Sequence, residues 1–340
     1  MLGPSYIADF SSRGPTEDGR ISPQIVAPGK YILSAGALPE YWGECDEYVP
    51  DVMGMSGEQG DIALLFKAGT SMATPVVSGT AALVRQYFEE EYYPVGRKKA
   101  GIYIKPSGAL VKAVLLNGAQ TDIKGVDNGS GGVTPTTAYD NTIGFGRVNL
   151  ATSLYIEGFS SVQAQVWDRE TLQDVVQEVK KYSVDIDRSK GCQHKDLSVT
   201  LVWVEEAATP GCTLCVLNDI DLEVTRNSDS TVHYPNGRTG PDRVNNAERV
   251  VIQDVADKED FTIQVRAHNL NVATQQFALV ATGCFGGVPN TLDMQASVFA
   301  ADEPTPPQNR TTLLIIISCS VLGGLLLVGL GFYFFAKKRV

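Results

Sequence analysis

Histidine and basic residues are both scarce in this sequence. The 340 residues include three histidines, His194, His233 and His268, so the first half of the chain has no imidazole that could act as a base. Lys and Arg number 28 against 39 Asp and Glu, and the net charge of −11 excludes the basic surface that nucleic-acid binding requires. Charged residues make up 20% and hydrophobic residues 43%, which excludes a largely disordered chain.

The N-terminus lacks a signal peptide, because its first residues include neither a basic segment nor an apolar one. The other end carries an uncharged run, 313–336, which as a helix would be about 36 Å long and would cross a membrane. Basic residues follow it, so the tail 337–340 is expected in the cytoplasm and the body outside the cell or in a lumen. Without a leader, the chain is predicted to be either a fragment or a tail-anchored cytosolic protein, and the basic tail favours the first.

Two patterns divide the rest of the chain. Residues 1–156 mix strand-like runs with two helices, whereas residues 157–286 place apolar side chains at every second position between clusters of Gly, Asn and Asp. The second pattern predicts an antiparallel β sandwich or barrel. Its inward positions are expected to be Tyr182, Val184, Ile186, Leu197, Val199, Leu201, Trp203, Phe261, Ile263, Val265, Phe277 and Leu279. Residues 287–312 are rich in polar residues, with prolines near their end, and are expected to form a stalk linker.

Two helices are expected in the first part. One covers about residues 71–87, and its many small side chains predict that it is buried and closely packed. The second begins after Ser107, which is a good N-cap residue, and stops at Gly118. Its apolar face consists of Leu110, Ala113 and Val114.

Cysteines are few and odd in number before residue 313, namely Cys45, Cys192, Cys212, Cys215 and Cys284, while Cys319 lies in the apolar run. At least one of the five therefore lacks a partner within the chain. The C-x-x-C pair would need a second ligand pair to bind a metal or a thioredoxin-like context to be redox-active, and a structural disulfide is expected instead. Asn128 and Asn309 begin N-x-S/T triplets and would be glycosylation acceptors in a luminal body.

Ser71 stands at the predicted start of the first helix, in the run G-T-S-M-A-T-P over 69–75. The first amides of a helix have no partner within the helix, and the positive end of the helix dipole favours a nearby oxyanion. Ser71 could therefore attack a carbonyl group while its own amide stabilises the negative charge that forms. The simpler alternative is a serine that only caps the helix.

Four blocks of sequence, taken together, resemble the subtilisin-like serine proteases. Residues 69–75 match their active-serine signature, and residues 10–15 (F-S-S-R-G-P), 24–29 (Q-I-V-A-P-G) and 144–149 (G-F-G-R-V-N) are similar to three further blocks in the same order. The resemblance implies that residues 1–156 are the C-terminal part of an α/β subtilisin-like peptidase domain. It also implies that Ser71 is the nucleophile, that its backbone amide is an oxyanion donor, and that catalysis needs no cofactor.

The second part is similar to a subgroup of large alkaline subtilases through residues 197–203, 217–222, 245–248 and 267–269. In that subgroup a jelly-roll β barrel follows the protease, so the resemblance implies a jelly roll over 157–286. The complete fold class expected is therefore a partial subtilisin-like α/β domain, an all-β jelly roll and one transmembrane helix.

The jelly-roll resemblance also implies a disulfide between Cys192 and Cys284, because they flank the first and last strands, which often lie side by side in this fold. Cys212 and Cys215 are a second candidate pair. Cys45 would then be left for a partner outside the chain.

The similar subtilases carry structural calcium, and this chain has oxygen-bearing residues that could hold it. Asp219 and Asp221 are two apart on an expected strand, so their carboxylates share one face. Asn246 and Glu248 repeat that spacing, and Asp242 precedes them. We therefore predict a calcium site from these five residues, with a solvated acidic rim as the alternative.

The Asp and His of a subtilase triad lie far upstream of the serine, and Ser71 has only 70 residues before it, none of them histidine. Without a base a serine is a poor nucleophile, so this chain alone is expected to be inactive. The function expected is the C-terminal part of a membrane-anchored serine endopeptidase that cleaves protein or peptide substrates through an acyl-enzyme. The alternative is a catalytically dead, membrane-anchored binding module that uses the β domain.

Overall fold

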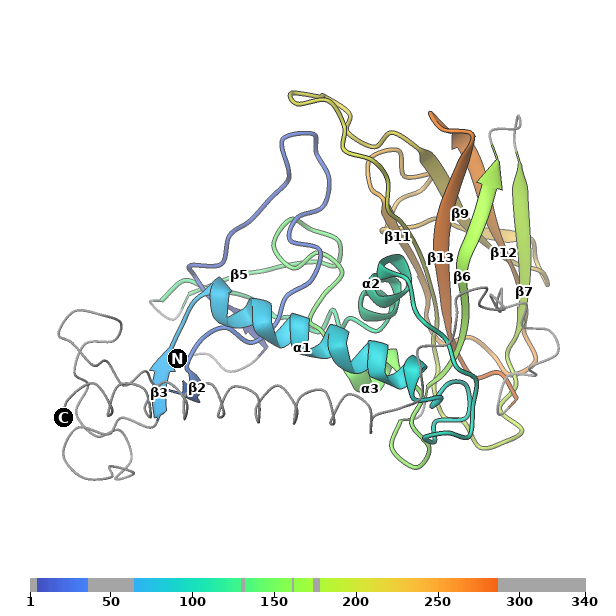
Figure 1. The fold of residues 1–340 in the computed structure, drawn as a ribbon, viewed down its shortest axis with the longest axis horizontal. Helices are drawn as coiled ribbons and strands as arrows, with labels where there is room; N and C mark the ends of the chain where they lie inside the picture. The colour runs from blue at the N-terminus through green and yellow to red at the C-terminus, as the bar shows by residue number, and fades with distance from the viewer. Residues whose placement is uncertain (1–4, 36–63, 130–131, 161, 174–177, 287–340) are drawn as a thin grey trace, which may run out of the picture. The chain divides into compact units, whose positions relative to one another are not determined.

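The computed structural model describes residues 5–35, 64–129, 132–160, 162–173 and 178–286, all within one compact unit (Figure 1). Three helices and thirteen strands are assigned in this part of the chain. In chain order they are β1 (Tyr6–Ile7), β2 (Ile32–Ala35), β3 (Leu64–Lys67), α1 (Thr70–Glu89), α2 (Gly108–Asn117), β4 (Gly125–Asp127), β5 (Val133–Thr134), α3 (Leu150–Ser153), β6 (Gln163–Gln173), β7 (Val179–Asp185), β8 (Leu197–Trp203), β9 (Asp219–Arg226), β10 (Thr231–His233), β11 (Ala247–Ile252), β12 (Asp260–Asn269) and β13 (Thr274–Gly283).

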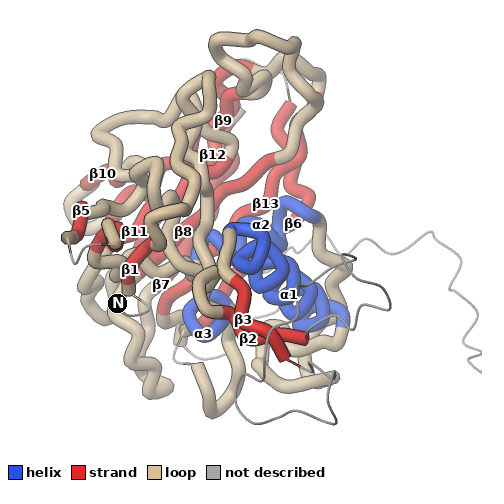
Figure 2. Tube along the Cα trace, turned by 90° about the vertical axis from the view of Figure 1, so that its left-hand side faces the viewer, coloured by secondary structure: helices blue, strands red, loops and turns tan. Residues whose placement is uncertain are grey.

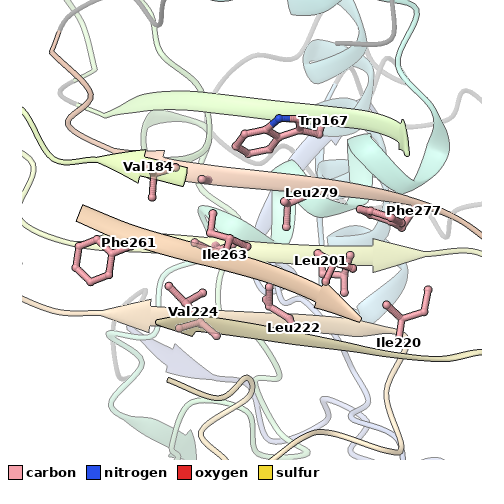
Figure 3. Close-up of a cluster of buried hydrophobic side chains, with 14 of the residues drawn as sticks. Trp167, Val184, Leu201, Ile220, Leu222, Val224, Phe261, Ile263, Phe277 and Leu279 are labelled. Carbon is pink, nitrogen blue, oxygen red and sulfur yellow. The ribbon is translucent and has the colours of Figure 1, made fainter. Parts of the chain in front are cut away.

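The second part of the chain is a β sandwich of two four-stranded antiparallel sheets, with the strand orders β11-β8-β13-β6 and β10-β9-β12-β7. Their facing side chains form the core, which includes Leu201, Ile220, Phe261 and Leu279 (Figure 3). The expected inward positions are all buried in this core or, for Tyr182, packed against it. The prediction of an antiparallel sandwich or barrel is thus confirmed, whereas the jelly-roll assignment stays a prediction.

Helix α2 explains why one sheet is covered on both faces. All seven residues of β8 are buried, although its alternating sequence pattern predicts that one face of the strand is exposed to solvent. The outer face of this sheet packs against α2, where Val202 and Val280 meet Leu110 and Val114 in one apolar cluster. Burial on both sides gives three layers, namely sheet, sheet and helix.

Polar side chains complete this contact between helix and sheet. Asn117 ends α2, and its amide nitrogen donates to Thr282 Oγ1 at 2.7 Å. Its amide oxygen accepts from the hydroxyls of Ser198 and Thr200, each at 2.9 Å. Arg249 of β11, also buried, donates to the carbonyl oxygens of Ala119 at 2.9 Å and Phe145 at 3.2 Å. The sandwich therefore holds segments from the first part of the chain by specific hydrogen bonds.

The prediction for α2 is confirmed in its bounds and its cap, because Ser107 Oγ accepts the amide of Leu110 at 3.0 Å and the helix ends at Gly118. Helix α1 also forms where it was predicted, but the prediction that it is buried is wrong. Only Val84, Tyr87 and Phe88 of its 20 residues are buried. Its small residues are only partly covered: Val77 and Ala81 are half-buried against an apolar cluster that includes α2, which lies beside α1 (Figure 2).

The predicted fold class needs a correction at its C-terminal end. The segment 313–336, predicted to span a membrane, lies outside the described residues, as do the stalk 287–312 and the tail 337–340. In the part that the structure describes, no helix is long and apolar enough to cross a membrane. The longest one, α1, carries charged side chains at Arg85 and Glu89. The domain boundary at residue 156 stays a prediction.

Candidate functional site

Ser71 lies in the first turn of α1, where its side chain is exposed. Gly69 precedes the helix, and its carbonyl oxygen accepts the amide of Met72 at 3.0 Å. The Ser71 hydroxyl donates to Met72 Sδ at 3.6 Å, a weak contact that a stronger acceptor would displace. Pro75 has no N–H, so the Ser71 carbonyl group lacks the usual donor four residues on. An exposed hydroxyl therefore stands in the first turn of α1, where backbone amides lack the partners that they have inside a helix.

The loop before Ser71 is held by a close contact between two glycines. The amide of Gly69 donates to the carbonyl oxygen of Gly29 at 2.7 Å. A Cβ atom on Gly29 would come within 2.8 Å of the Gly69 oxygen, so a side chain there would push the serine loop away. Position 29, the last of block 24–29, therefore has to be glycine because the backbone of block 69–75 passes so close to it.

Backbone hydrogen bonds also hold the other two blocks, 10–15 and 144–149, in place near this loop. Val26 donates its amide to the Gly146 carbonyl at 3.0 Å, and Val148 donates to Val26 at 2.9 Å. Gly14 donates to the carbonyls of Ser22 at 2.8 Å and Asn141 at 3.0 Å. The structure therefore links three of the four blocks directly, 24–29, 69–75 and 144–149, and bonds block 10–15 to residues that stand just before two of them.

A cavity of about 590 Å³ lies beside the serine loop. Its lining comes from β1, from residues 26–31 and from the start of α1, and it includes the backbone next to Ser71 at Gly69 and Thr70. Apolar side chains such as Ile7 and Val148 dominate it. The neighbours of Ser71 in the chain, Gly69 and Thr70, thus line a mainly apolar hollow of the kind that binds small molecules and peptides.

The three histidines lie in the second part of the chain. His194 precedes β8, His233 is in β10 and His268 is in β12. Burial lowers the pKa of His194 and of His233, and the Nε2 atom of His233 is buried without a hydrogen-bond partner. Among the described residues, the hydroxyl of Ser71 has no histidine as a hydrogen-bond partner. That none of them serves Ser71 as a base stays a prediction.

The residues predicted to bind calcium are partnered by an arginine instead. Arg243 forms ion pairs with Asp219 at 3.3 Å and, more closely, with Asp221. Burial raises the pKa of both aspartates, and the guanidinium group opposes that rise. The predicted sharing of one face is correct, because the alternate residues Ile220 and Leu222 enter the core.

The other predicted ligands are used within the protein as well. Glu248 is fully buried, and one carboxyl oxygen accepts the amide of Leu222 at 2.7 Å. Asp242 is also buried; it accepts from the side chain of Asn236 at 2.7 Å and pairs with Arg238 at 3.0 Å. Asn246 accepts the amide of Trp203 through its backbone oxygen.

These contacts involve the residues that were predicted to bind calcium. In the described ranges, no group of three His, Cys, Asp or Glu side chains is arranged to hold a metal ion. Arg243 therefore lies over the face on which calcium was predicted, which favours the alternative without a metal, and the calcium site stays a prediction. Sequence reasoning missed this arginine, although Arg243 stands beside Asp242 in an otherwise neutral stretch.

The cysteine pairs have the partners expected for them. Cys192 and Cys284 form a disulfide with a Cα–Cα distance of 5.7 Å, and Cys212 and Cys215 form another. Asn128 is exposed after β4, close to the hydroxyl of Thr134. Cys45, Asn309 and Cys319 lie outside the described residues.

Comparison with known proteins gives this arrangement its context. Residues 3–146 match the subtilase family model. The chain is 29% identical over 323 residues to the serine protease/ABC transporter B family protein tagD of Dictyostelium discoideum, covering 83% of this chain and 17% of the relative. Pyrolysin of Pyrococcus furiosus is 41% identical over 113 residues, which cover 33% of this chain and 6% of the relative.

A shorter match is the serine protease AprX of Bacillus subtilis, 40% identical over 80 residues, covering 24% of this chain and 16% of AprX. The chain spans about a sixth of the length of the Dictyostelium relatives that it matches. The match to the family model covers three of the four blocks in full and the first residues of block 144–149. Residues 3–146, the part of the chain that holds Ser71, are therefore similar to the subtilase family.

Proposed function

We propose that this chain supplies the nucleophile of a serine endopeptidase. The observation that carries the proposal is the exposed hydroxyl of Ser71 at the N-terminus of α1, inside the G-T-S-M-A-T-P run. The relatives named above as serine proteases support the reaction class. Proteins or peptides are the substrates that this chemistry implies, and subtilases need no cofactor for it.

In the proposed reaction, Ser71 Oγ attacks the carbonyl carbon of the scissile peptide bond and gives up its proton to a base. The carbonyl oxygen becomes an oxyanion, which the Ser71 amide stabilises together with the positive end of α1. The amine then leaves with a proton from the protonated base, and an ester to Ser71 remains. Water hydrolyses that ester, releases the acid product and restores the hydroxyl.

The base is proposed to come from outside the described residues of this chain. Each of the three histidines lies in or next to the β sandwich, and Ser71 has none of them as a hydrogen-bond partner in the described part. The chain alone is therefore expected to hydrolyse peptides poorly. Oxyanion stabilisation without a base supports only a small fraction of the rate of a complete triad.

Labelling with a fluorophosphonate probe tests the nucleophile. In the native protein that contains this chain, we expect one labelled site, which Ser71→Ala abolishes. Ser78→Ala is the matched control, because Ser78 is an exposed hydroxyl on the same helix and donates to the Thr74 carbonyl at 3.1 Å. Labelling that persists in Ser71→Ala, or that Ser78→Ala removes equally, would contradict the assignment.

A further inference from the structure

The two disulfides of the described residues differ in what they connect. Cys192 and Cys284 are 92 residues apart and tie the approach to β8 to the end of β13. Cys212 and Cys215 are three residues apart and close a loop between β8 and β9. The first disulfide joins distant parts of the sandwich, whereas the second constrains a single turn.

The short-range disulfide is the more accessible one. Cys212 and Cys215 are half-buried, and Leu214 between them is 54% exposed. In the other disulfide Cys192 is half-buried as well, whereas Cys284 is 1% exposed. Because thiol–disulfide exchange begins with attack on a sulfur atom, the C-x-x-C pair offers two partly accessible residues for attack and Cys192–Cys284 offers one.

The strand that follows the C-x-x-C loop is anchored without the disulfide. The Glu205 carboxylate accepts the amides of Leu217 at 3.0 Å and Asn218 at 2.8 Å. The Asn218 side chain is buried and donates to Gln275 at 2.7 Å, and Val216 belongs to the apolar core. Opening the disulfide would therefore free the turn while β9 stays in place.

A metal site does not account for the C-x-x-C pair. Structural zinc requires four ligands, usually two such pairs, and the described residues contain no group of three that could hold a metal. The pair is also joined as a disulfide, which cannot ligate a metal as thiolates do.

We propose that Cys212–Cys215 is a thiol–disulfide exchange site, reduced and re-formed by external dithiols while Cys192–Cys284 stays closed. A thiolate of the dithiol attacks one sulfur atom and forms a mixed disulfide, and the other protein sulfur leaves as a thiolate and takes up a proton. The second thiol of the reagent then displaces the remaining protein sulfur. The reagent becomes a disulfide, and its two electrons and two protons are now on Cys212 and Cys215.

Reduction of the folded full chain with dithiothreitol, followed by alkylation and peptide mapping, tests the proposal. Cys212 and Cys215 should be alkylated at least about tenfold faster than Cys192 and Cys284, with an unchanged circular dichroism spectrum. A second arm with thioredoxin and its reductase asks whether a protein dithiol acts as well as the small one. Equal rates for both disulfides, or faster reduction of Cys192–Cys284, would overturn the proposal.

Two double variants separate exchange from a structural role. Cys212→Ser with Cys215→Ser should melt within a few degrees of the wild type, because a short loop removes little entropy from the unfolded chain. The matched control, Cys192→Ser with Cys284→Ser, opens a long loop and should lower the melting temperature much more. Equal losses in the two variants would identify the C-x-x-C disulfide as structural and refute the exchange site.

Discussion

Lys112 on α2 shows how one half-buried charge can work against stability. Its partial burial lowers its pKa to about 8, with Arg20 acting in the same direction. Between this pKa and the ordinary value near 10.5, the unfolded chain binds more protons than the folded one, so this contribution to stability rises with pH. Below about pH 8 the cost of the half-buried charge is fully present.

Lys112→Met should therefore stabilise the protein at pH 7, by about 1–3 kcal/mol, and the gain should shrink towards pH 10. Thermal melts of variant and wild type at both pH values measure the difference. Lys105→Met is the control, because Lys105 is exposed and lies just before the same helix. A gain that is equal at pH 7 and pH 10 would show that Met improves packing only.

Single residues also mark what could be predicted of the site from sequence. The prediction for Ser71 rests on seven consecutive residues that resemble the active-serine signature of subtilases, because a helix start with a serine would by itself be equally consistent with a simple cap. Arg243 was not, because the spacing of Asp219 and Asp221 indicates a shared face and says nothing about which cation lies over that face. The spacing of residues in the sequence indicates which side chains share a face of a helix or strand. Which opposite charge lies over that face is set by tertiary contacts.

At the scale of elements, the sequence pattern predicted where helices and strands lie in the chain better than it predicted which of their faces are buried. Helix α2 was predicted correctly because its cap and stop are local signals, at Ser107 and Gly118. Strand β8 has an alternating sequence and yet is buried on both faces, since the polar residues of its outer face bond to Asn117 of α2. Helix α1 has the composition of a buried helix and is largely exposed. Burial depends on contacts with segments that are distant in sequence. The spacing of apolar residues within one element gives no information about these contacts.

The edge of β9 provides a prediction at this scale. Arg243 balances two aspartates there, so removing calcium with a chelator should leave the melting temperature of the wild type unchanged. Arg243→Gln should lose about 1–3 kcal/mol, because it leaves the buried carboxylate of Asp221 and the half-buried one of Asp219 without a cation. The comparison variant is Arg85→Gln, which breaks an exposed ion pair with Glu89 and should cost less than about 0.5 kcal/mol. A lower melting temperature of the wild type in chelator would contradict this prediction and support a calcium site.

At the scale of the whole molecule, the two sequence patterns do not correspond to two separate cores. One apolar cluster contains Leu110 and Phe145 from the first part together with Val202 and Val280 from the sandwich. Arg249 adds hydrogen bonds across the same contact, to two backbone oxygens. A core shared in this way couples the unfolding of both parts, so the described residues should unfold in a single cooperative transition.

Arg249→Met tests this coupling. The methionine keeps most of the apolar stem but leaves the carbonyl oxygens of Ala119 and Phe145 without their donor, at an expected cost of about 2–4 kcal/mol. Because the core is continuous, calorimetry should show one transition that moves to lower temperature. As a control, Arg169→Met removes an exposed guanidinium bond to the Lys105 carbonyl and should shift the transition much less. Two resolved transitions in Arg249→Met would mean that the sandwich and the first part of the chain are stable independently, and that the buried arginine is what joins them.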